Sequence, residues 1–337
     1  MGRVLPRGGA IVNLFRIGFL FLGLFFLSAA TLASEQGGIE IHATTTATSA
    51  RPKIGLALGG GGARGVAHIG VLRVLEEQKV PIDFVAGTSM GAIVGGFYCA
   101  GVPLDRIQTL LEDKQLLHAY YTVPIAVRVA IMPVMLLPHV FGYQSYDGWY
   151  RGNKFAHFVE RELPAGRTNI EDLKIPFCAV TSDLLAGKAF AVKRGNLSRA
   201  IQASSAVPVL RKPVAMDDKL LVDGGIEANL PVHQVKEMGA DLVIAVDVDE
   251  SFDERKKDFR KLNSVGNRVT SMILHEIDED QVRCADIVVR PDVNRITLLS
   301  NKTSDAAKAV EAGRVAALEA MPEIRQRLLR AGLVLKD

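Results

Sequence analysis

The stretch "IGLALGGGGARGVAHIGVLRVLEE" occupies residues 54–77 and decides the fold class. It begins with five mainly apolar residues, continues through four consecutive glycines and Arg64, and ends in an amphipathic run. A glycine turn between a strand and a helix suits two kinds of anion: the pyrophosphate of a dinucleotide or the oxyanion of an acyl-transfer reaction. The rest of the sequence indicates which of them this loop binds.

Strand-like and helix-like segments alternate along the chain after residue 53. The pattern predicts strands at residues 54–58, 82–86, 177–181, 190–192, 220–222, 242–248 and 287–290. It predicts helices at residues 66–78, 92–100, 197–204, 231–238, 265–280 and 304–329. Such alternation indicates an α/β fold with a parallel or mixed sheet between layers of helices.

The N-terminus has the composition of a targeting segment. Three arginines precede an apolar run at 17–27, and small residues follow at 28–34. This is the order of a secretory signal peptide, with cleavage after Ala30 or Ala33, but residues 17–33 are also just long enough for an uncleaved anchor. We therefore expect export across the cytoplasmic membrane, to a periplasmic or membrane-anchored location.

Charge and cysteine content exclude other classes. The formal net charge is +3, and removing the three N-terminal arginines leaves 37 basic and 37 acidic residues, so nothing indicates a nucleic-acid partner. Cys99, Cys178 and Cys284 are far apart and form no metal-binding spacing. We expect buried apolar roles for them.

A second glycine motif follows the first. Residues 87–91, "GTSMG", match G-x-S-x-G between an expected strand and an expected helix. This is the context of a nucleophile elbow, in which the flanking glycines Gly87 and Gly91 let the strand and the helix approach closely. The motif makes Ser89 the candidate nucleophile.

A serine nucleophile needs a base. Asp223 lies in "LLVDGGIEANLPV", at the end of an expected strand and before two glycines, where it can reach across the sheet edge to Ser89. His233 and His275 follow it but have no turn-like, glycine-rich context. We expect both histidines on helix surfaces.

The dinucleotide alternative fits residues 60–65, which match G-x-G-x-x-G. That fold requires an acid at the end of the second strand, where this sequence has the elbow, and Asp83 lies at that strand's start. We therefore expect the loop to offer the N–H groups of Gly61 and Gly62 to an oxyanion, with Arg64 adding positive charge nearby.

Several motifs together resemble one family. The ordered set "GGGGARG" (59–65), "GTSMG" (87–91) and "DGG" (223–225) resembles the patatin-like phospholipases, and particularly the bacterial members related to neuropathy target esterase. Further similarity lies in "TSDLLAGKAF" (181–190), "AIQASSAVPVL" (200–210) and "NLPV" (229–232). The resemblance covers residues 54–248.

The resemblance implies a three-layer α/β/α fold with a central, mainly parallel sheet and a nucleophile elbow. It implies lipid acyl hydrolysis, of phospholipase A or lysophospholipase type, by a Ser–Asp dyad that needs no histidine, cofactor or metal. Ser89 would be the nucleophile and Asp223 the base. The oxyanion loop would comprise Gly60, Gly61 and Gly62, supported by Arg64. The remaining motif glycines are Gly65, Gly87, Gly91, Gly224 and Gly225, the last standing where many members have alanine.

The expected organisation follows from these segments: a signal or anchor (1–33), a linker (34–53), the catalytic domain (54–250), and a mainly helical C-terminal extension packed on that domain (251–337). Within the domain, residues 123–142 are strongly apolar but contain three prolines, which break any membrane-spanning helix. This insertion is either a helix–turn segment packed on the core or a lipid-facing cover over a pocket.

The expected partners are a phospholipid or lysophospholipid substrate and a membrane surface. The sequence gives no information on oligomeric state. A non-catalytic lipid-sensing or adaptor protein on the same fold is the alternative function, and the intact Ser89, Asp223 and glycine loop argue against it.

Overall fold

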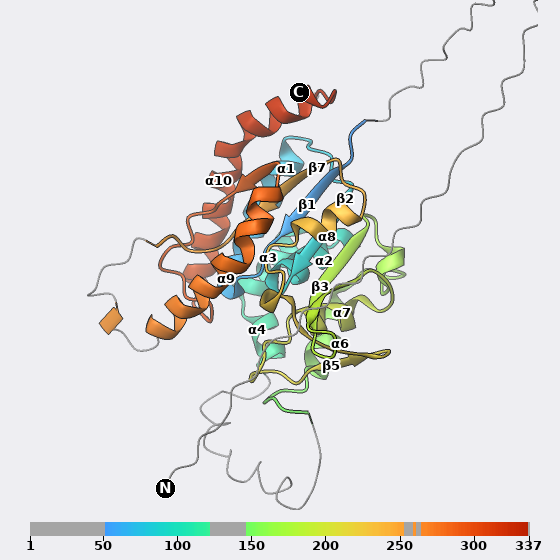
Figure 1. Cartoon of the computed structure of the whole chain (residues 1–337), viewed down its shortest axis with the longest axis vertical. Helices are drawn as coiled ribbons and strands as arrows, with labels where there is room; N and C mark the ends of the chain where they lie inside the picture. Colours follow the sequence, from blue (N-terminus) through green and yellow to red (C-terminus); the bar gives the residue numbers. More distant parts are fainter. Residues whose placement is uncertain (1–50, 122–145, 253–258, 261–263, 336–337) are drawn as a thin grey trace, which may run out of the picture. The chain divides into compact units, whose positions relative to one another are not determined.

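The computed structural model describes residues 51–121, 146–252, 259–260 and 264–335, all within the compact unit Ala50–Asp337. Figure 1 shows this unit as a sheet flanked by helices. The predicted signal or anchor segment and the 123–142 insertion lie outside the described residues. Among the helices that are described, none has both the length and the apolar character needed to cross a bilayer.

The central sheet of the described residues has eight strands. Their order is β5 (Val214–Met216), β6 (Lys219–Asp223), β3 (Phe177–Asp183), β2 (Phe84–Thr88), β1 (Ile54–Leu58), β7 (Leu242–Val246) and β8 (Ile287–Val289), with β4 (Lys188–Val192) paired to β3. The pairings among β3, β2, β1, β7 and β8 are parallel, and those of β4, β5 and β6 are antiparallel. The sheet is therefore mixed, with a parallel centre.

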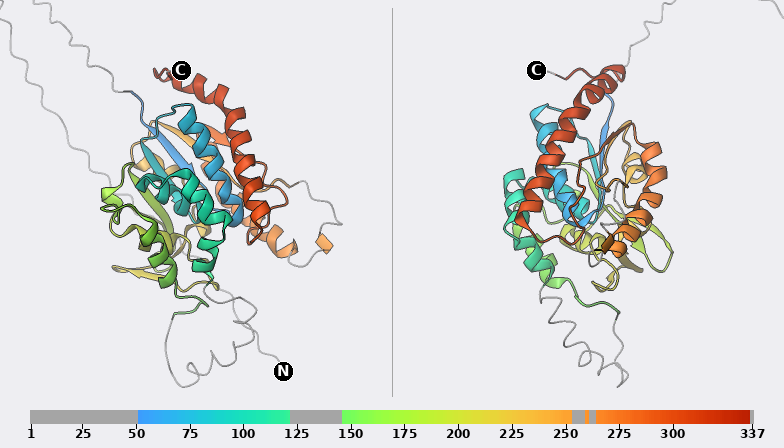
Figure 2. Two further views of the ribbon diagram at one scale, coloured as in Figure 1. Left: turned by 180° about the vertical axis from the view of Figure 1, so that it is seen from behind. Right: turned by 90° about the vertical axis from the view of Figure 1, so that its left-hand side faces the viewer.

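Helices cover both faces of the sheet (Figure 2). One layer contains α1 (Ala67–Glu77), α2 (Met90–Ala100), α3 (Leu104–Glu112), α4 (Gln115–Tyr120), α6 (Asn153–Glu162), α7 (Leu197–Ser204) and α10 (Thr303–Arg330). The other contains α8 (Val232–Glu237) and α9 (Ser264–Cys284). Three short 3-10 turns complete the described elements: η1 (Gly62–Val66), η2 (Ile170–Asp172) and η3 (Gly224–Ile226).

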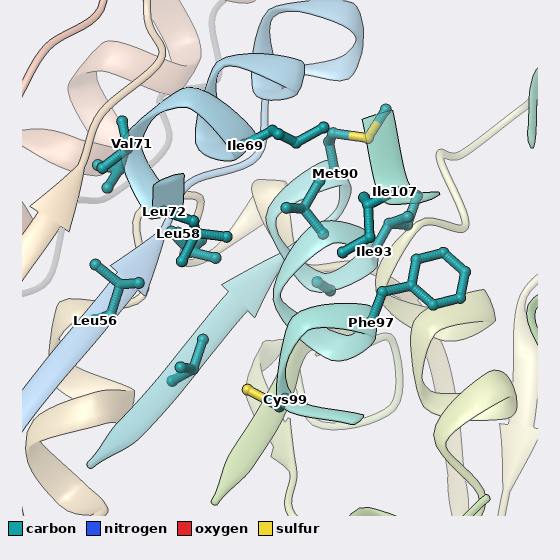
Figure 3. Packing of buried hydrophobic residues seen from close by; sticks show 14 of the residues in the cluster. Leu56, Leu58, Ile69, Val71, Leu72, Met90, Ile93, Phe97, Cys99 and Ile107 are labelled. Carbon is teal, nitrogen blue, oxygen red and sulfur yellow. The ribbon is translucent and has the colours of Figure 1, made fainter. Parts of the chain in front are cut away.

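The two layers have separate hydrophobic cores because successive strand residues point to opposite faces. In β1, Leu56 and Leu58 belong to the core under α1 and α2, whereas Ala57 belongs to the core under α8. Figure 3 shows side chains of the first core, among them Leu58 of β1, Leu72 of α1 and Ile93 of α2. Large apolar side chains thus fill one face, and smaller ones such as Ala57 and Ala86 let the second layer approach closely.

The predicted three-layer α/β/α fold is confirmed, with some differences in its elements. The second strand begins at Phe84 rather than at residue 82, because the Asp83 carboxylate accepts a hydrogen bond from the Ile54 N–H at 2.8 Å. The sequence analysis assigned no helix to α3, α4 or α6. These helices are amphipathic, and tertiary packing on the first layer stabilises them.

Candidate active site

The sheet register brings two strand ends together. On one edge of β3, Val180 pairs with Thr88 of β2, and the next residue, Thr181, pairs with Asp223 of β6. The opposite edge of β3 is occupied by β4. Since β2 runs parallel to β3 and β6 runs antiparallel to it, the C-terminal ends of β2 and β6 meet at this point. Ser89, one residue beyond β2, therefore faces Asp223.

Ser89 occupies a strained turn between β2 and α2. Its φ of 52° and ψ of −113° lie in a region that residues other than glycine rarely adopt. The turn brings α2 so close to β1 that a Cβ atom on Gly91 would lie 2.1 Å from the Leu58 carbonyl oxygen. The Ser89 N–H donates to Ser204 Oγ at 3.0 Å, and Ser204 Oγ donates to the Val180 carbonyl at 2.6 Å. The elbow is thus fixed by its neighbours.

The Ser89 hydroxyl and the Asp223 carboxylate are in direct contact. Ser89 Oγ donates to Asp223 Oδ2 at 2.7 Å, while the Gly225 N–H donates to Oδ1 at 2.9 Å and fixes the carboxylate's orientation. Asp223 is buried, and this burial raises its pKa to about 6, although both hydrogen bonds lower the pKa. A carboxylate of this basicity beside a hydroxyl can accept the proton of an attacking serine.

The glycine loop presents two unpaired amides. The Gly60 N–H donates to the Asn229 carbonyl at 3.0 Å, and the Ala63 N–H donates to the Leu298 carbonyl at 2.9 Å. The N–H groups of residues 61–62, between these anchors, have no hydrogen-bond partner among the described residues. These two amides are the N–H groups that the sequence predicted would face an oxyanion, while the Gly60 N–H anchors the loop to Asn229.

The guanidinium of Arg64, which the sequence predicted would support the oxyanion loop, contacts the C-terminal part of the chain. The Arg64 side chain is buried away from the cavity that contains Ser89. The guanidinium donates to the Ile296 carbonyl at 2.7 Å and to Ser271 Oγ at 3.2 Å, and it forms an ion pair with Glu250. These partners all come from the C-terminal part of the chain, which the motif spacing does not describe. Arg64 thus ties η1 to that part of the chain.

A carboxylate from α9 supports the loop from the opposite face. Asp278 Oδ2 accepts from Asn229 Nδ2 at 2.7 Å, and Asp278 Oδ1 accepts from the Leu230 N–H at 2.6 Å. Asn229 in turn accepts the Gly60 N–H through its carbonyl. Burial is the main cause that raises the pKa of Asp278 to about 7. The "NLPV" motif is visible in the sequence, but no sequence signal links it to Asp278 on α9.

His68 is a second residue that the sequence analysis missed. It is fully buried on α1, and its Nε2 lies 2.8 Å from the Gly59 carbonyl oxygen. Burial lowers its pKa to about 4, so the ring is neutral at pH 7 and its Nε2–H donates to Gly59. The sequence signal that could have identified His68 is its position three residues after Gly65, in a helix that begins beside the loop.

Ser89, Asp223 and residues 61–62 line one cavity of about 500 Å³. Most of its other lining residues are apolar, among them Val66, Met90, Ile93, Leu111, Leu116, Leu117, Leu210, Ile226, Ile273, Leu274, Ile277 and Leu298. The volume and lining suit a ligand with a hydrocarbon chain. The cavity is therefore mainly apolar, with Ser89 and Asp223 in its wall.

The remaining predicted site residues are structural. Gly65 lies in η1, Gly87 in β2, Gly91 in α2, and Gly224 and Gly225 in η3; of these five, Gly225 also lines the cavity. No described histidine lines the cavity. His233 contacts Asp280 at 2.9 Å, and the His275 ring packs edge-on against Phe252.

The comparisons with known proteins identify the family of the chain. The sequence profile described as "Patatin-like phospholipase" matches residues 56–236, more than half of the chain. The chain belongs to the patatin-like phospholipase family.

Among its relatives are NTE family proteins of Mycobacterium tuberculosis and Mycobacterium bovis, each 40% identical over 203 residues, which are 60% of this chain and 51% of the relative. A lysophospholipase NTE1 of Mycosarcoma maydis is 36% identical over 218 residues, 64% of this chain and 11% of the relative. The chain thus matches about half of the mycobacterial relatives and about a ninth of the fungal one.

Solved structures to which this chain is similar include VipD from Legionella pneumophila. It has a TM-score of 0.44 at 14% identity, with 81% of this chain and 67% of that chain covered. The type III effector ExoU has a TM-score of 0.37 at 14% identity, with 80% of this chain and 53% of that chain covered.

Proposed function

We propose that this chain is a serine lipid acyl hydrolase that cleaves carboxylic esters of membrane phospholipids or lysophospholipids. The observation that carries the proposal is the 2.7 Å hydrogen bond from Ser89 Oγ to Asp223 Oδ2 inside an apolar cavity. The family of the chain and the name of its fungal relatives, lysophospholipase, support the same class of reaction. The dyad roles of Ser89 and Asp223 are part of the proposal.

The reaction begins with proton transfer. Asp223 accepts the proton of Ser89 Oγ as that oxygen attacks the ester carbonyl carbon, and the carbonyl oxygen becomes an oxyanion. The N–H groups of residues 61–62 donate to this oxyanion, and they need no reorganisation because no acceptor in the described part of the chain binds them. The tetrahedral intermediate then collapses. Asp223 gives its proton to the departing alcohol, and an acyl-Ser89 ester remains.

Water completes the cycle. Asp223 takes a proton from a water molecule, whose oxygen attacks the acyl-enzyme, and a second oxyanion forms in the same loop. Collapse of this intermediate releases the fatty acid and returns the proton to Ser89. The apolar lining of the cavity accommodates the acyl chain and keeps bulk water from Ser89 and Asp223, where electrostatic stabilisation is then stronger.

We further propose that the cavity mouth meets a membrane surface. Four apolar lining residues are also solvent-exposed: Val207, Ile226, Ile273 and Leu299. On α9, Val265, Val269 and Met272 extend this exposed apolar surface at helical spacing. Apolar surface of this kind, next to an apolar cavity, suits a site that takes acyl chains from a bilayer.

Export is a separate proposal that rests on the N-terminal sequence pattern. Fractionation of cells that express the full chain should place it in the periplasm or the membrane, and deletion of residues 1–33 should retain it in the cytoplasm. The mass of the recovered chain distinguishes a cleaved signal from a retained anchor. Cytoplasmic full-length protein would contradict the proposal.

The function is tested with the purified chain on a panel of phospholipids, lysophospholipids and neutral esters, together with a fluorophosphonate probe. We expect ester cleavage and probe labelling at Ser89, both lost in Ser89→Ala. Ser251→Ala is the matched control, because Ser251 is an exposed serine that does not line the cavity. A wild-type chain that cleaves no ester and resists the probe would favour a non-catalytic lipid-binding protein.

A further inference from the structure

Three side chains with different metal-ligating atoms converge on the α8–α9 surface. The ligand atoms of His233, Asp280 and Cys284 all lie within 4.8 Å of one another. His233 Nε2 is 2.9 Å from Asp280 Oδ2, and these two side chains are 42% and 65% exposed. None of the three lines the cavity or takes part in the proposed reaction. The group is therefore open to an ion from solvent.

The backbone arranges these side chains before any ion binds. Asp280 and Cys284 are four residues apart on α9, so they project from the same face of that helix. His233 lies in the first turn of α8, and its N–H donates to Gln281 Oε1 at 3.0 Å. This bond fixes α8 against α9 beside Asp280. Rotation of side chains alone can then bring the three ligand atoms together.

We propose that His233, Asp280 and Cys284 form a binding site for a divalent cation of the Zn²⁺ type. Imidazole nitrogen, carboxylate oxygen and thiolate sulfur are the donors that Zn²⁺ accepts, at about 2.0–2.3 Å. In a tetrahedron of such bonds the ligand atoms lie roughly 3.3–3.8 Å apart. The most distant pair therefore has to approach by about 1.5 Å at most, and the His233 and Asp280 ligand atoms, now 2.9 Å apart, have to separate slightly. The thiolate and the imidazole disfavour Mg²⁺ and Ca²⁺, which prefer oxygen ligands.

The three ligands can neutralise the charge of the ion and leave one coordination position open. On binding, the Cys284 thiol releases its proton to solvent, so one carboxylate and one thiolate neutralise the divalent ion. Arg283 lies 3.7 Å from Asp280 Oδ1, the oxygen that faces away from His233, and it leaves Oδ2 for the ion. The exposure of His233 and Asp280 leaves the fourth position to water. This coordination is that of a three-ligand site with an open position.

The ion would crosslink α8 to α9. Asp278, which holds Asn229 and Leu230, is only two residues before Asp280 on the same helix. An ion at the trio would therefore fasten the helix that supports the glycine loop. It would act on stability and would take no part in the chemistry at Ser89.

The test is a titration of the full chain, without an affinity tag, with Co²⁺ and then Zn²⁺ in chelator-treated buffer. We expect one equivalent per chain, a thiolate-to-Co²⁺ charge-transfer band that Zn²⁺ abolishes, and a higher Tm with Zn²⁺ because the ion binds the folded state. Cys284→Ser and His233→Ala should lose the band. Asp280→Asn should weaken binding at least about tenfold, since it removes an anionic ligand. The matched controls are His275→Ala and Glu279→Gln, from the same helix, which should bind like wild type.

Alkylation of the wild-type chain gives a second measurement that needs no variant. Zn²⁺ should slow modification of Cys284 at least about tenfold, since the coordinated thiolate is shielded, while the buried Cys99 and Cys178 serve as internal references. The proposal is wrong if saturating Co²⁺ gives no thiolate band and Zn²⁺ leaves the alkylation of Cys284 unchanged. It is equally wrong if both Cys284→Ser and His233→Ala bind the ion as wild type does.

Discussion

The motif-bearing region, residues 54–237, and the C-terminal segment, residues 242–335, contribute to the same site in different ways. The first contains Ser89, Asp223 and the glycine loop, and the match to the family profile lies entirely within it. The second has no motif that the sequence analysis recognised. It nevertheless adds β7 and β8 to the sheet and α10 to the helix layer beside α1.

Several contacts of the C-terminal segment reach the glycine loop and the residues that anchor it. Its Leu298 carbonyl accepts the Ala63 N–H, its Glu250 pairs with Arg64, and its Asp278 holds Asn229. Part of the cavity wall also comes from α9 and from residues 298–303. The reactive side chains therefore come from the motif region, whereas the C-terminal segment fixes the orientation of the amides that would meet the substrate.

The largest effects should come from the motif region alone. Ser89→Ala and Asp223→Asn should each lower kcat by about a thousandfold or more, and the double variant should lose little further, because the two groups act as a unit. Ester hydrolysis under saturating substrate measures this. Asp218→Asn, an exposed carboxylate in the same β5–β6 hairpin, should leave kcat unchanged. Full activity in Asp223→Asn would transfer the base role to another group.

The glycine loop, where the two regions meet, should give the next largest effect. A Cβ atom on Gly61 would lie 2.7 Å from Val248 Cγ2, so Gly61→Ala must displace an amide that faces the oxyanion. We expect a loss of about a hundredfold in kcat with little change in KM. Gly266→Ala is the control, because a Cβ atom there meets nothing within 4 Å. A rise in KM of the same size would mean that the loop binds the substrate rather than the transition state.

The pH dependence distinguishes the carboxylates of the two regions. With the pKa of Asp223 at about 6, kcat/KM should fall about tenfold for each pH unit below 6, as the base becomes protonated. Asp278, whose pKa is raised to about 7, belongs to the C-terminal segment, and Asp278→Asn should keep the same acid limb. A limb that moves in this variant would contradict the assignment to Asp223.

The same shift predicts a stability difference with a definite sign. Because the pKa of Asp223 is higher in the folded chain than in the unfolded chain, its contribution to stability is complete below about pH 4 and is lost as the pH rises through 6. Asp223→Asn should therefore unfold at a higher denaturant concentration than wild type near about pH 8, with a difference that disappears toward about pH 4.

Asp278→Asn tests the supporting role of the C-terminal segment directly. Asparagine keeps an acceptor for the Leu230 N–H but places a donor against Asn229 Nδ2, so the loop loses one support. We expect about a tenfold loss in kcat at unchanged KM, with faster amide hydrogen exchange in residues 59–63. Glu279→Gln is the neighbouring control. A folded Asp278→Asn with wild-type kcat would show that the motif region sets its own loop geometry.

The smallest effect concerns the exposed apolar face of α9. Val269→Ser with Met272→Ser should weaken binding to phosphatidylcholine vesicles by about tenfold, if each side chain contributes roughly 0.7 kcal/mol. Cleavage of short soluble esters should be unchanged, because neither residue lines the cavity. Val334→Ser, an exposed apolar residue near the other end of the segment, is the control. Undiminished vesicle binding would remove α9 from the membrane-contact proposal.

The sequence by itself was sufficient to predict the fold class and to pair Ser89 with Asp223 as candidate nucleophile and base. Alternating apolar runs predicted every described strand except β5 and most of the described helices, and two glycine motifs with one aspartate selected Ser89 and Asp223. These features are local: a nucleophile elbow needs small residues beside its serine, and a turn after a strand needs glycine, so each leaves a pattern within a few residues.

Only the tertiary structure decided which residues anchor the glycine loop and where Arg64 points. Those outcomes depend on Leu298, Glu250 and Asp278, which lie from about 50 to more than 200 residues away from their partners in the chain. The trio on α8 and α9 is likewise formed by residues up to 51 positions apart. Hydrogen bonds and ion pairs across such separations depend on helix packing and leave no periodic or motif signal, so the sequence predicted the reactive groups but not the surroundings that orient them.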